Sequence, residues 1–109
     1  MNIRLNNKAL FETNTGLKVL EVDLTTILPE VPFELSQFTV AVDGHSPDES
    51  HEEREIWIIT SGSGQLKYKG AIYNLIAGQA VTFSPNIVHT IKNTGETTLN
   101  VISIWWKEQ

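Results

Sequence analysis

The chain of 109 residues is 40% hydrophobic and 19% charged, which predicts one globular domain over residues 1–109 and excludes a disordered chain. Its formal net charge is −5 and its eight lysines and arginines are scattered, which argues against nucleic-acid binding, since that requires clustered positive charge. The absence of cysteine excludes disulfides, thiolate metal ligands and cysteine nucleophiles, so a metal would need nitrogen and oxygen ligands.

The N-terminal stretch, residues 1–15, is polar and lacks the apolar core of a secretory signal. No segment approaches the roughly 20 apolar residues that cross a bilayer. We therefore expect a cytoplasmic protein that does not insert into membranes.

Short segments of strand composition alternate with turn signals along the whole chain. In residues 17–24, leucine and valine stand at both odd and even positions, so they would lie on both faces of a strand. In residues 33–42, Phe38, Val40 and Val42 fall on one face. Residues 55–60 and 101–106 are apolar at both parities, which is typical of strands covered on both faces. We expect these two strands to be central.

No window carries the helical spacing of apolar residues together with caps, so helix content should be very low. Nine or ten short strands in a chain of this length favour an all-β barrel or jelly roll, because both architectures protect many strand edges. An immunoglobulin-like sandwich is the structural alternative.

The acidic stretch before the first central strand holds the main candidates for chemistry. In a regular strand, side chains two positions apart share a face, so Glu49, His51, Glu53, Glu55 and Trp57 would lie on one side. A second histidine, His89, follows the proline turn at residues 84–86. This pattern predicts nitrogen and oxygen donors gathered beside an aromatic wall.

Two spaced motifs connect these residues. The first comprises Gly44, His51, Glu55 and Gly62, and the second comprises Gly78, Pro85, His89 and Asn93. Together they resemble the paired motifs of the cupin superfamily, at residues 44–62 and 78–93. The resemblance to a small single-domain cupin implies a double-stranded β-helix, that is, a jelly-roll barrel that encloses a metal site.

The resemblance implies that His51, Glu55 and His89 bind a divalent ion, with open positions left for substrate, water or O₂. Glu49 stands where the family has its first histidine, and it could be a fourth ligand or only a loop carboxylate. Carboxylate ligands favour Mn²⁺ or Fe²⁺, while Ni²⁺ or Zn²⁺ could compete. Asn86 replaces a turn glycine, and asparagine tolerates the left-handed conformation required there.

The remaining candidates have simpler interpretations. We expect Trp57 to line the pocket, and Glu55 could act as an acid or base. His45 reads as a loop histidine, with replacement of the missing ligand as a minor alternative. Asn93, Gly62 and Gly64 read as turn residues, and Glu52, Glu53 and Arg54 read as solvated charges that contribute little to stability.

The leading functional hypothesis is a metal-dependent enzyme that acts on a small organic molecule, with dioxygenase, isomerase or lyase chemistry all compatible. One alternative is a non-catalytic cupin that binds or senses a small ligand, with the metal absent or structural. Another is a purely structural β subunit. The resemblance, together with the apolar central strands and the terminal Ile104, Trp105 and Trp106, predicts a homodimer.

Overall fold

The computed structural model describes residues 5–107. This part of the chain forms nine strands: β1 (Asn6–Glu12), β2 (Leu17–Asp23), β3 (Glu34–Val40), β4 (Arg54–Ser61), β5 (Ser63–Tyr68), β6 (Ala71–Ile76), β7 (Ala80–Phe83), β8 (His89–Asn93) and β9 (Leu99–Trp106). The one helical element in this range is a single 3₁₀ turn, η1 (Leu24–Thr26), and it is far too short to cross a membrane. The predicted all-β class and very low helix content are confirmed.

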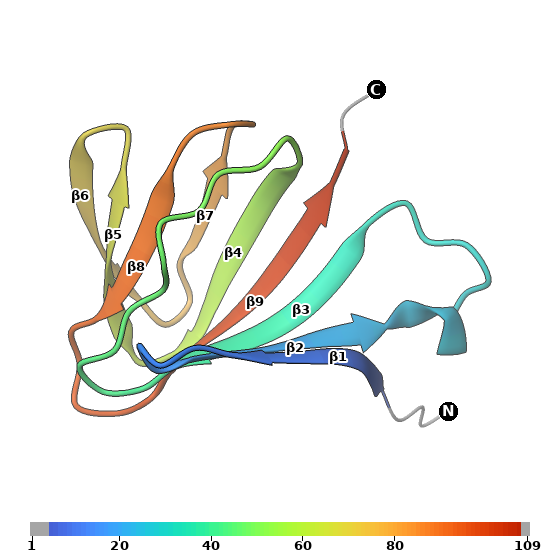
Figure 1. Ribbon diagram of the computed structural model, residues 1–109, viewed down its shortest axis with the longest axis horizontal. Helices are drawn as coiled ribbons and strands as arrows, with labels where there is room; N and C mark the ends of the chain where they lie inside the picture. The colour runs from blue at the N-terminus through green and yellow to red at the C-terminus, as the bar shows by residue number, and fades with distance from the viewer. Residues whose placement is uncertain (1–4, 108–109) are drawn as a thin grey trace.

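The strands form two antiparallel sheets (Figure 1). The larger has the order β1-β2-β3-β9-β4-β7 and the smaller has the order β6-β5-β8. The predicted central position of β4 and β9 is confirmed, because β9 pairs with β3 and β4, and β4 pairs with β9 and β7. Among the described strands, hydrogen bonds do not close the two sheets into one continuous barrel.

The core lies between the two sheets and is built by alternate residues of each strand. Along β4 the inward side chains are Glu55, Trp57 and Ile59, and along β9 they include Val101 and Ser103. The other buried apolar side chains are Leu17, Val22, Phe38, Val40, Leu66, Leu75, Phe83, Ile91 and Leu99. One face of each central strand therefore carries both core and polar groups.

Two local expectations change once the strands are placed, and a third is confirmed. Strand β3 ends at Val40, so Val42 lies outside it and is 46% exposed rather than sharing the buried face. Gly64 lies within β5 instead of a turn, and a Cβ there would come within 2.9 Å of Leu99 Cδ2. Asn86 does adopt the left-handed conformation, with φ of 62°.

Candidate metal centre

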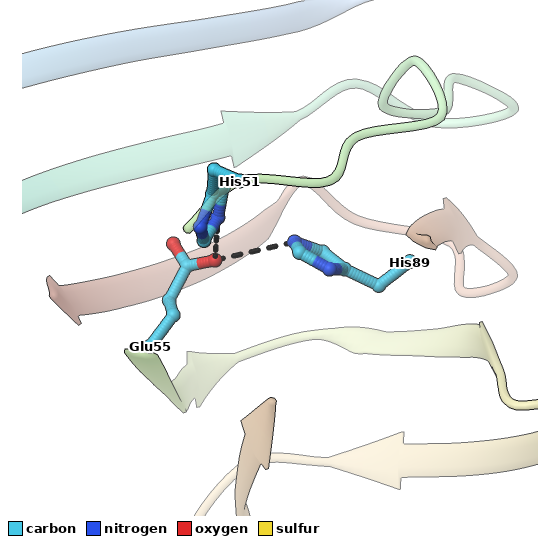
Figure 2. Close-up of side chains that lie close together, drawn as sticks. All are labelled: His51, Glu55 and His89. Carbon is cyan, nitrogen blue, oxygen red and sulfur yellow. Dashed lines mark hydrogen bonds and ion pairs between the residues drawn. The ribbon is translucent and has the colours of Figure 1, made fainter. Parts of the chain in front are cut away.

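Three side chains from separate parts of the fold converge at one end of the space between the sheets (Figure 2). His51 comes from the loop before β4, Glu55 from β4 and His89 from the start of β8. One oxygen of Glu55, Oε1, lies 3.1 Å from His51 Nε2 and 3.2 Å from His89 Nε2. The structure thus brings together three of the four predicted ligands, and one nitrogen or oxygen atom of each lies within 4.8 Å of the others.

The second ring nitrogen of each histidine fixes its tautomer. His51 Nδ1 lies 3.0 Å from the carbonyl oxygen of Glu53, and His89 Nδ1 lies 3.1 Å from the carbonyl oxygen of Ile87. A carbonyl only accepts, so each Nδ1 carries the proton and donates. Each Nε2 atom faces Glu55, so it can bind a cation through its lone pair when the ring is neutral, or donate to the carboxylate when it carries a proton.

His89 is almost completely buried and packs against an aromatic ring. Its exposed fraction is 2%, and its ring stacks on Phe83 with centroids 4.1 Å apart. Its Nε2 makes no hydrogen bond with the described residues, although Glu55 Oε1 is close. A buried ring nitrogen whose close polar neighbour is a carboxylate oxygen needs a proton or a cation between the two atoms.

Glu55 is positioned by a residue of the neighbouring strand. Ser103 on β9 donates a hydrogen bond of 2.5 Å to Glu55 Oε2, which leaves Oε1 directed at the two histidines. Burial by itself raises the pKa of Glu55, but contacts with His89, Ser103 and Trp57 outweigh it, so the net pKa is lowered. The carboxyl is therefore ionised at neutral pH, as a metal ligand must be.

These distances fit a divalent cation. Two ligands at about 2.1 Å from one ion and 90° apart lie about 3.0 Å from each other. The two nitrogen to oxygen distances of 3.1 and 3.2 Å match this separation. A carboxylate oxygen that faces two lone pairs needs a positive charge between them, and a metal ion or bound protons would supply it.

The loop that carries His51 is not an extension of β4, contrary to the regular strand assumed from alternation. Instead, the backbone of Glu49 bridges that of His89 on β8, with hydrogen bonds of 3.1 and 2.9 Å. The amide of Asn86 donates to the carbonyl of His51 at 2.6 Å. His51 therefore reaches Glu55 through loop contacts with the second motif, whereas alternation holds only for Glu55 and Trp57.

Two further carboxylates flank the cluster without belonging to it. Glu49 is exposed in the loop, and its pKa is raised first by partial desolvation and then by the charge of Glu55, against a smaller opposing effect of the two histidines. Glu53 is 27% exposed and its Oε2 lies 3.5 Å from His51 Nδ1, so it is less solvated than we expected. Glu52 is a surface charge that pairs with Lys107.

A cavity of about 300 Å³ opens beside the cluster. Its walls are formed by Phe11, Thr13, Leu17, Val19, Ser36, Phe38, Ser46, Pro47, Glu49, His51, Glu53, Glu55, Trp57, Ser103 and Trp105. Trp57 stands in this wall, 5.3 Å from His89 between ring centroids, and its buried Nε1 has no hydrogen-bond partner among the described residues. The cavity combines aromatic walls with the polar cluster at one side.

His45 lies apart from the cluster and is exposed, with Nδ1 2.9 Å from the carbonyl oxygen of Ser46. Asn93 is buried and bonds only to the backbone, so its structural interpretation agrees with the contacts. Sequence reasoning missed Ser103. Its signal was a single polar residue within the apolar run 101–106, but that signal becomes specific only once β9 is paired beside β4.

A family model for the cupin domain matches residues 36–105, which is more than half of the chain and includes His51, Glu55 and His89. This chain belongs to the cupin family. A cupin 2 conserved barrel domain protein from Salinispora arenicola superposes with a TM-score of 0.76 at 28% identity, covering 98% of this chain and 89% of that one. The resemblance predicted from the two motifs is confirmed.

Two more solved structures show the same cupin fold. KdgF from a Halomonas species has a TM-score of 0.76 at 14% identity, covering 100% of this chain and 96% of that chain. An oxalate oxidase has a TM-score of 0.73 at 19% identity, covering 87% of this chain and 53% of its own. At these identities the likeness establishes the architecture, and the activities named belong to those proteins.

Proposed function

We propose that this cupin binds one divalent metal ion through His51, Glu55 and His89 and acts on a small organic molecule in the adjoining cavity. Mn²⁺ or Fe²⁺ fits the nitrogen and oxygen donor set best, with Ni²⁺ or Zn²⁺ as competitors. Glu49 is the proposed fourth ligand if its loop carboxylate turns toward the cluster.

The observation that carries the proposal is the pair of histidine Nε2 atoms facing one carboxylate oxygen. Both rings have their Nδ1 atoms committed to backbone carbonyls, and His89 Nε2 is buried without a hydrogen bond. A purely structural polar cluster would satisfy its own donors and acceptors. Here the carboxylate oxygen and the two Nε2 atoms need a positive charge between them, and a divalent cation would supply it.

Each part of the chain has a distinct task in this proposal. The backbone carbonyls that accept from the two Nδ1 atoms orient the rings and hold the required tautomer, as such outer contacts do in metal sites. Ser103 fixes the Glu55 carboxylate. The aromatic walls restrict the entry of water and hold the ligand's apolar body.

A divalent ion with open positions can polarise a carbonyl, activate water or support O₂ chemistry, so dioxygenase, isomerase and lyase reactions all remain within the proposal. In a metal-loaded site Glu55 is a ligand. Its alternative use as an acid or base therefore belongs to the metal-free form.

Elemental analysis by mass spectrometry tests the metal proposal directly. The protein is purified without chelator or polyhistidine tag, beside the double variant His51→Ala, His89→Ala. We expect close to one equivalent of Mn, Fe, Ni or Zn in the wild type and none in the variant. A wild type that holds no metal and takes up none of these four ions would contradict the proposal.

A non-catalytic ligand-binding cupin is the second candidate. The cavity with aromatic walls favours it as much as it favours an enzyme, because neither needs a nucleophile. Turnover of ligands by the metal-loaded protein would separate the two. Ligand binding that is independent of metal and never followed by product formation would make the binding module the better account.

We also propose a homodimer. Strand β1 is an edge of the larger sheet, and Leu10 and Phe11 on it are 55% and 53% exposed. Exposed apolar residues on an edge strand favour pairing with another chain. Light scattering at micromolar concentration should give twice the monomer mass of 12.2 kDa, and a monomeric mass would contradict this proposal.

A further inference from the structure

The charge of the cavity wall restricts the class of ligand. Three carboxylates, Glu49, Glu53 and Glu55, line the cavity, whereas none of the lysines and arginines in residues 5–107 does so. The acidic residues range from Glu55, whose side chain is 11% exposed, through Glu53 at 27% to the exposed Glu49. Negative charge therefore extends from the buried cluster to the entrance.

A metal ion reduces this charge without reversing it. With both histidines neutral, three carboxylates and one divalent ion leave a net charge of −1. A carboxylate ligand would then meet the metal but, among the described wall residues, no guanidinium or ammonium to balance its repulsion by Glu49 and Glu53. Like charges in a partly desolvated cavity repel more strongly than in bulk water.

The rest of the wall is largely apolar and aromatic. Phe11, Phe38, Trp57 and Trp105 line it together with aliphatic residues of β2. Aromatic faces attract cations as well as apolar groups. Trp57 is only 3% exposed, and its Nε1–H lacks a hydrogen-bond partner among the described residues. This wall therefore suits the apolar body of a ligand, and its ring faces can also contact a cation.

The volume of about 300 Å³ lies at the lower end of the range for ligand sites. It suits a molecule of one ring or a short chain. We propose that the cavity takes a small organic amine with an aromatic or aliphatic body, bound with its ammonium toward Glu49 and Glu53, and that it rejects carboxylates. This inference rests on the proposed function and specifies its substrate class.

Three probes that share one phenylethyl body and differ in the terminal group test the inference: 2-phenylethylamine, 2-phenylethanol and 3-phenylpropionate. Titration calorimetry at pH 7 and low salt measures each on the metal-free and on the Zn²⁺-loaded protein. We expect the amine to bind at least about tenfold more tightly than the carboxylate in both forms, with the alcohol between them. Loading with Zn²⁺ should reduce the ratio of amine affinity to carboxylate affinity. Salt at 0.5 M should reduce this ratio as well, because it screens charges.

Variants then assign the preference to the wall. Glu49→Gln combined with Glu53→Gln should remove the amine preference and leave the alcohol affinity unchanged, which also shows that the variant folds. The matched control is Glu52→Gln, whose side chain pairs with Lys107 on the surface, and it should keep the wild-type preference. Phe11→Ala, at a 53% exposed position, should weaken all three probes alike.

The inference is overturned if the carboxylate binds as tightly as the amine in either form, if the double variant keeps the preference, or if none of the three probes binds. Metal content is measured separately on the same samples. An intact metal site with a preference for the carboxylate would reject only the ligand class. An amine preference without metal uptake would reject only the metal proposal.

Discussion

The two ends of strand β8 present opposite solutions to burying a polar side chain. At its end, Asn93 is 1% exposed, and its amide donates to the carbonyls of Val40 and Thr97 while Oδ1 accepts from the amide of Gly95, each at 2.9 Å. At its start, His89 is 2% exposed, and its Nε2 has no hydrogen-bond partner in the described part of the chain. Four positions along one strand separate a completed network from an incomplete one.

This difference indicates a structural role for Asn93 and a functional role for His89 within one strand. Buried polar groups are normally paired because an unpaired one destabilises the fold. Asn93 follows that rule and ties the loop after β8 to the end of β3. His89 departs from it at the point where Glu55 and His51 converge, and this departure supports the proposed cation site.

Replacing Asn93 by alanine should have the largest effect on stability. Three backbone groups lose their partner, so we expect the free energy of unfolding to fall by about 2–4 kcal/mol, with metal affinity unchanged. Urea unfolding and metal analysis measure the two quantities. The control is Asn100→Ala, which removes two hydrogen bonds on β9 that are more exposed to solvent. It should lower the free energy of unfolding by less than about 1 kcal/mol. If the folded fraction of Asn93→Ala no longer bound metal, the separation between a structural Asn93 and a metal-binding His89 would be contradicted.

The variant Glu55→Gln should act in the opposite way. The amide keeps an acceptor for Ser103 and gains a donor for a histidine Nε2, so metal-free stability should change by less than about 1 kcal/mol. Loss of the anionic ligand should weaken metal binding by at least about 100-fold. Titration with Mn²⁺ and urea unfolding provide the test. Unchanged metal affinity would remove Glu55 from the site.

Ser103→Ala sharpens the comparison further, because Ser103 acts only through Glu55. Losing its bond to Oε2 should lower metal affinity about 10-fold to 100-fold, the usual range for an outer partner of a ligand. Ser36→Ala is the matched control, since Ser36 is also buried, lines the cavity and lies opposite Ser103 in the β3 and β9 register. Equal losses in both variants would indicate general loosening of the cavity.

The smallest effect belongs to Glu52→Gln. Its partner Lys107 is 70% exposed, and exposed ion pairs contribute little. We expect stability within about 0.5 kcal/mol of the wild type and unchanged metal affinity, measured in the same two assays. A large loss in either would mean that acidic residues around His51 act collectively, and that the cluster is not confined to three side chains.

The sequence allowed the all-β class, the central strands and the gathering of His51, Glu55 and His89 to be predicted. Strand composition and alternation gave the first two, whereas the third came from the spacing of two motifs. Alternation predicted that His51 shares a face with Glu55 by assuming a regular strand. That assumption is wrong, because residues 46–53 form a loop held to β8. Its position depends on long-range backbone contacts that carry no periodic signal.

Other parts of the site depend on the way in which strands pair. Ser103 contacts Glu55 because β9 lies beside β4, and nothing in the run 101–106 specifies that neighbour. Glu53 became part of the cavity wall because its loop turns inward, whereas its sequence position between two charged residues indicated solvent. Pairing and loop course are set by the whole fold, so local patterns could not predict them.

The central claim is that the incomplete end of β8 is a cation site, and thermal unfolding with and without excess Mn²⁺ tests it most directly. A ligand at 100 times its dissociation constant stabilises the folded state by about 2.7 kcal/mol. We predict an upward shift of several degrees in the wild type and none in His51→Ala, His89→Ala. Equal shifts in both proteins, or no shift with Mn²⁺, Fe²⁺, Ni²⁺ or Zn²⁺ up to millimolar concentration, would contradict the account.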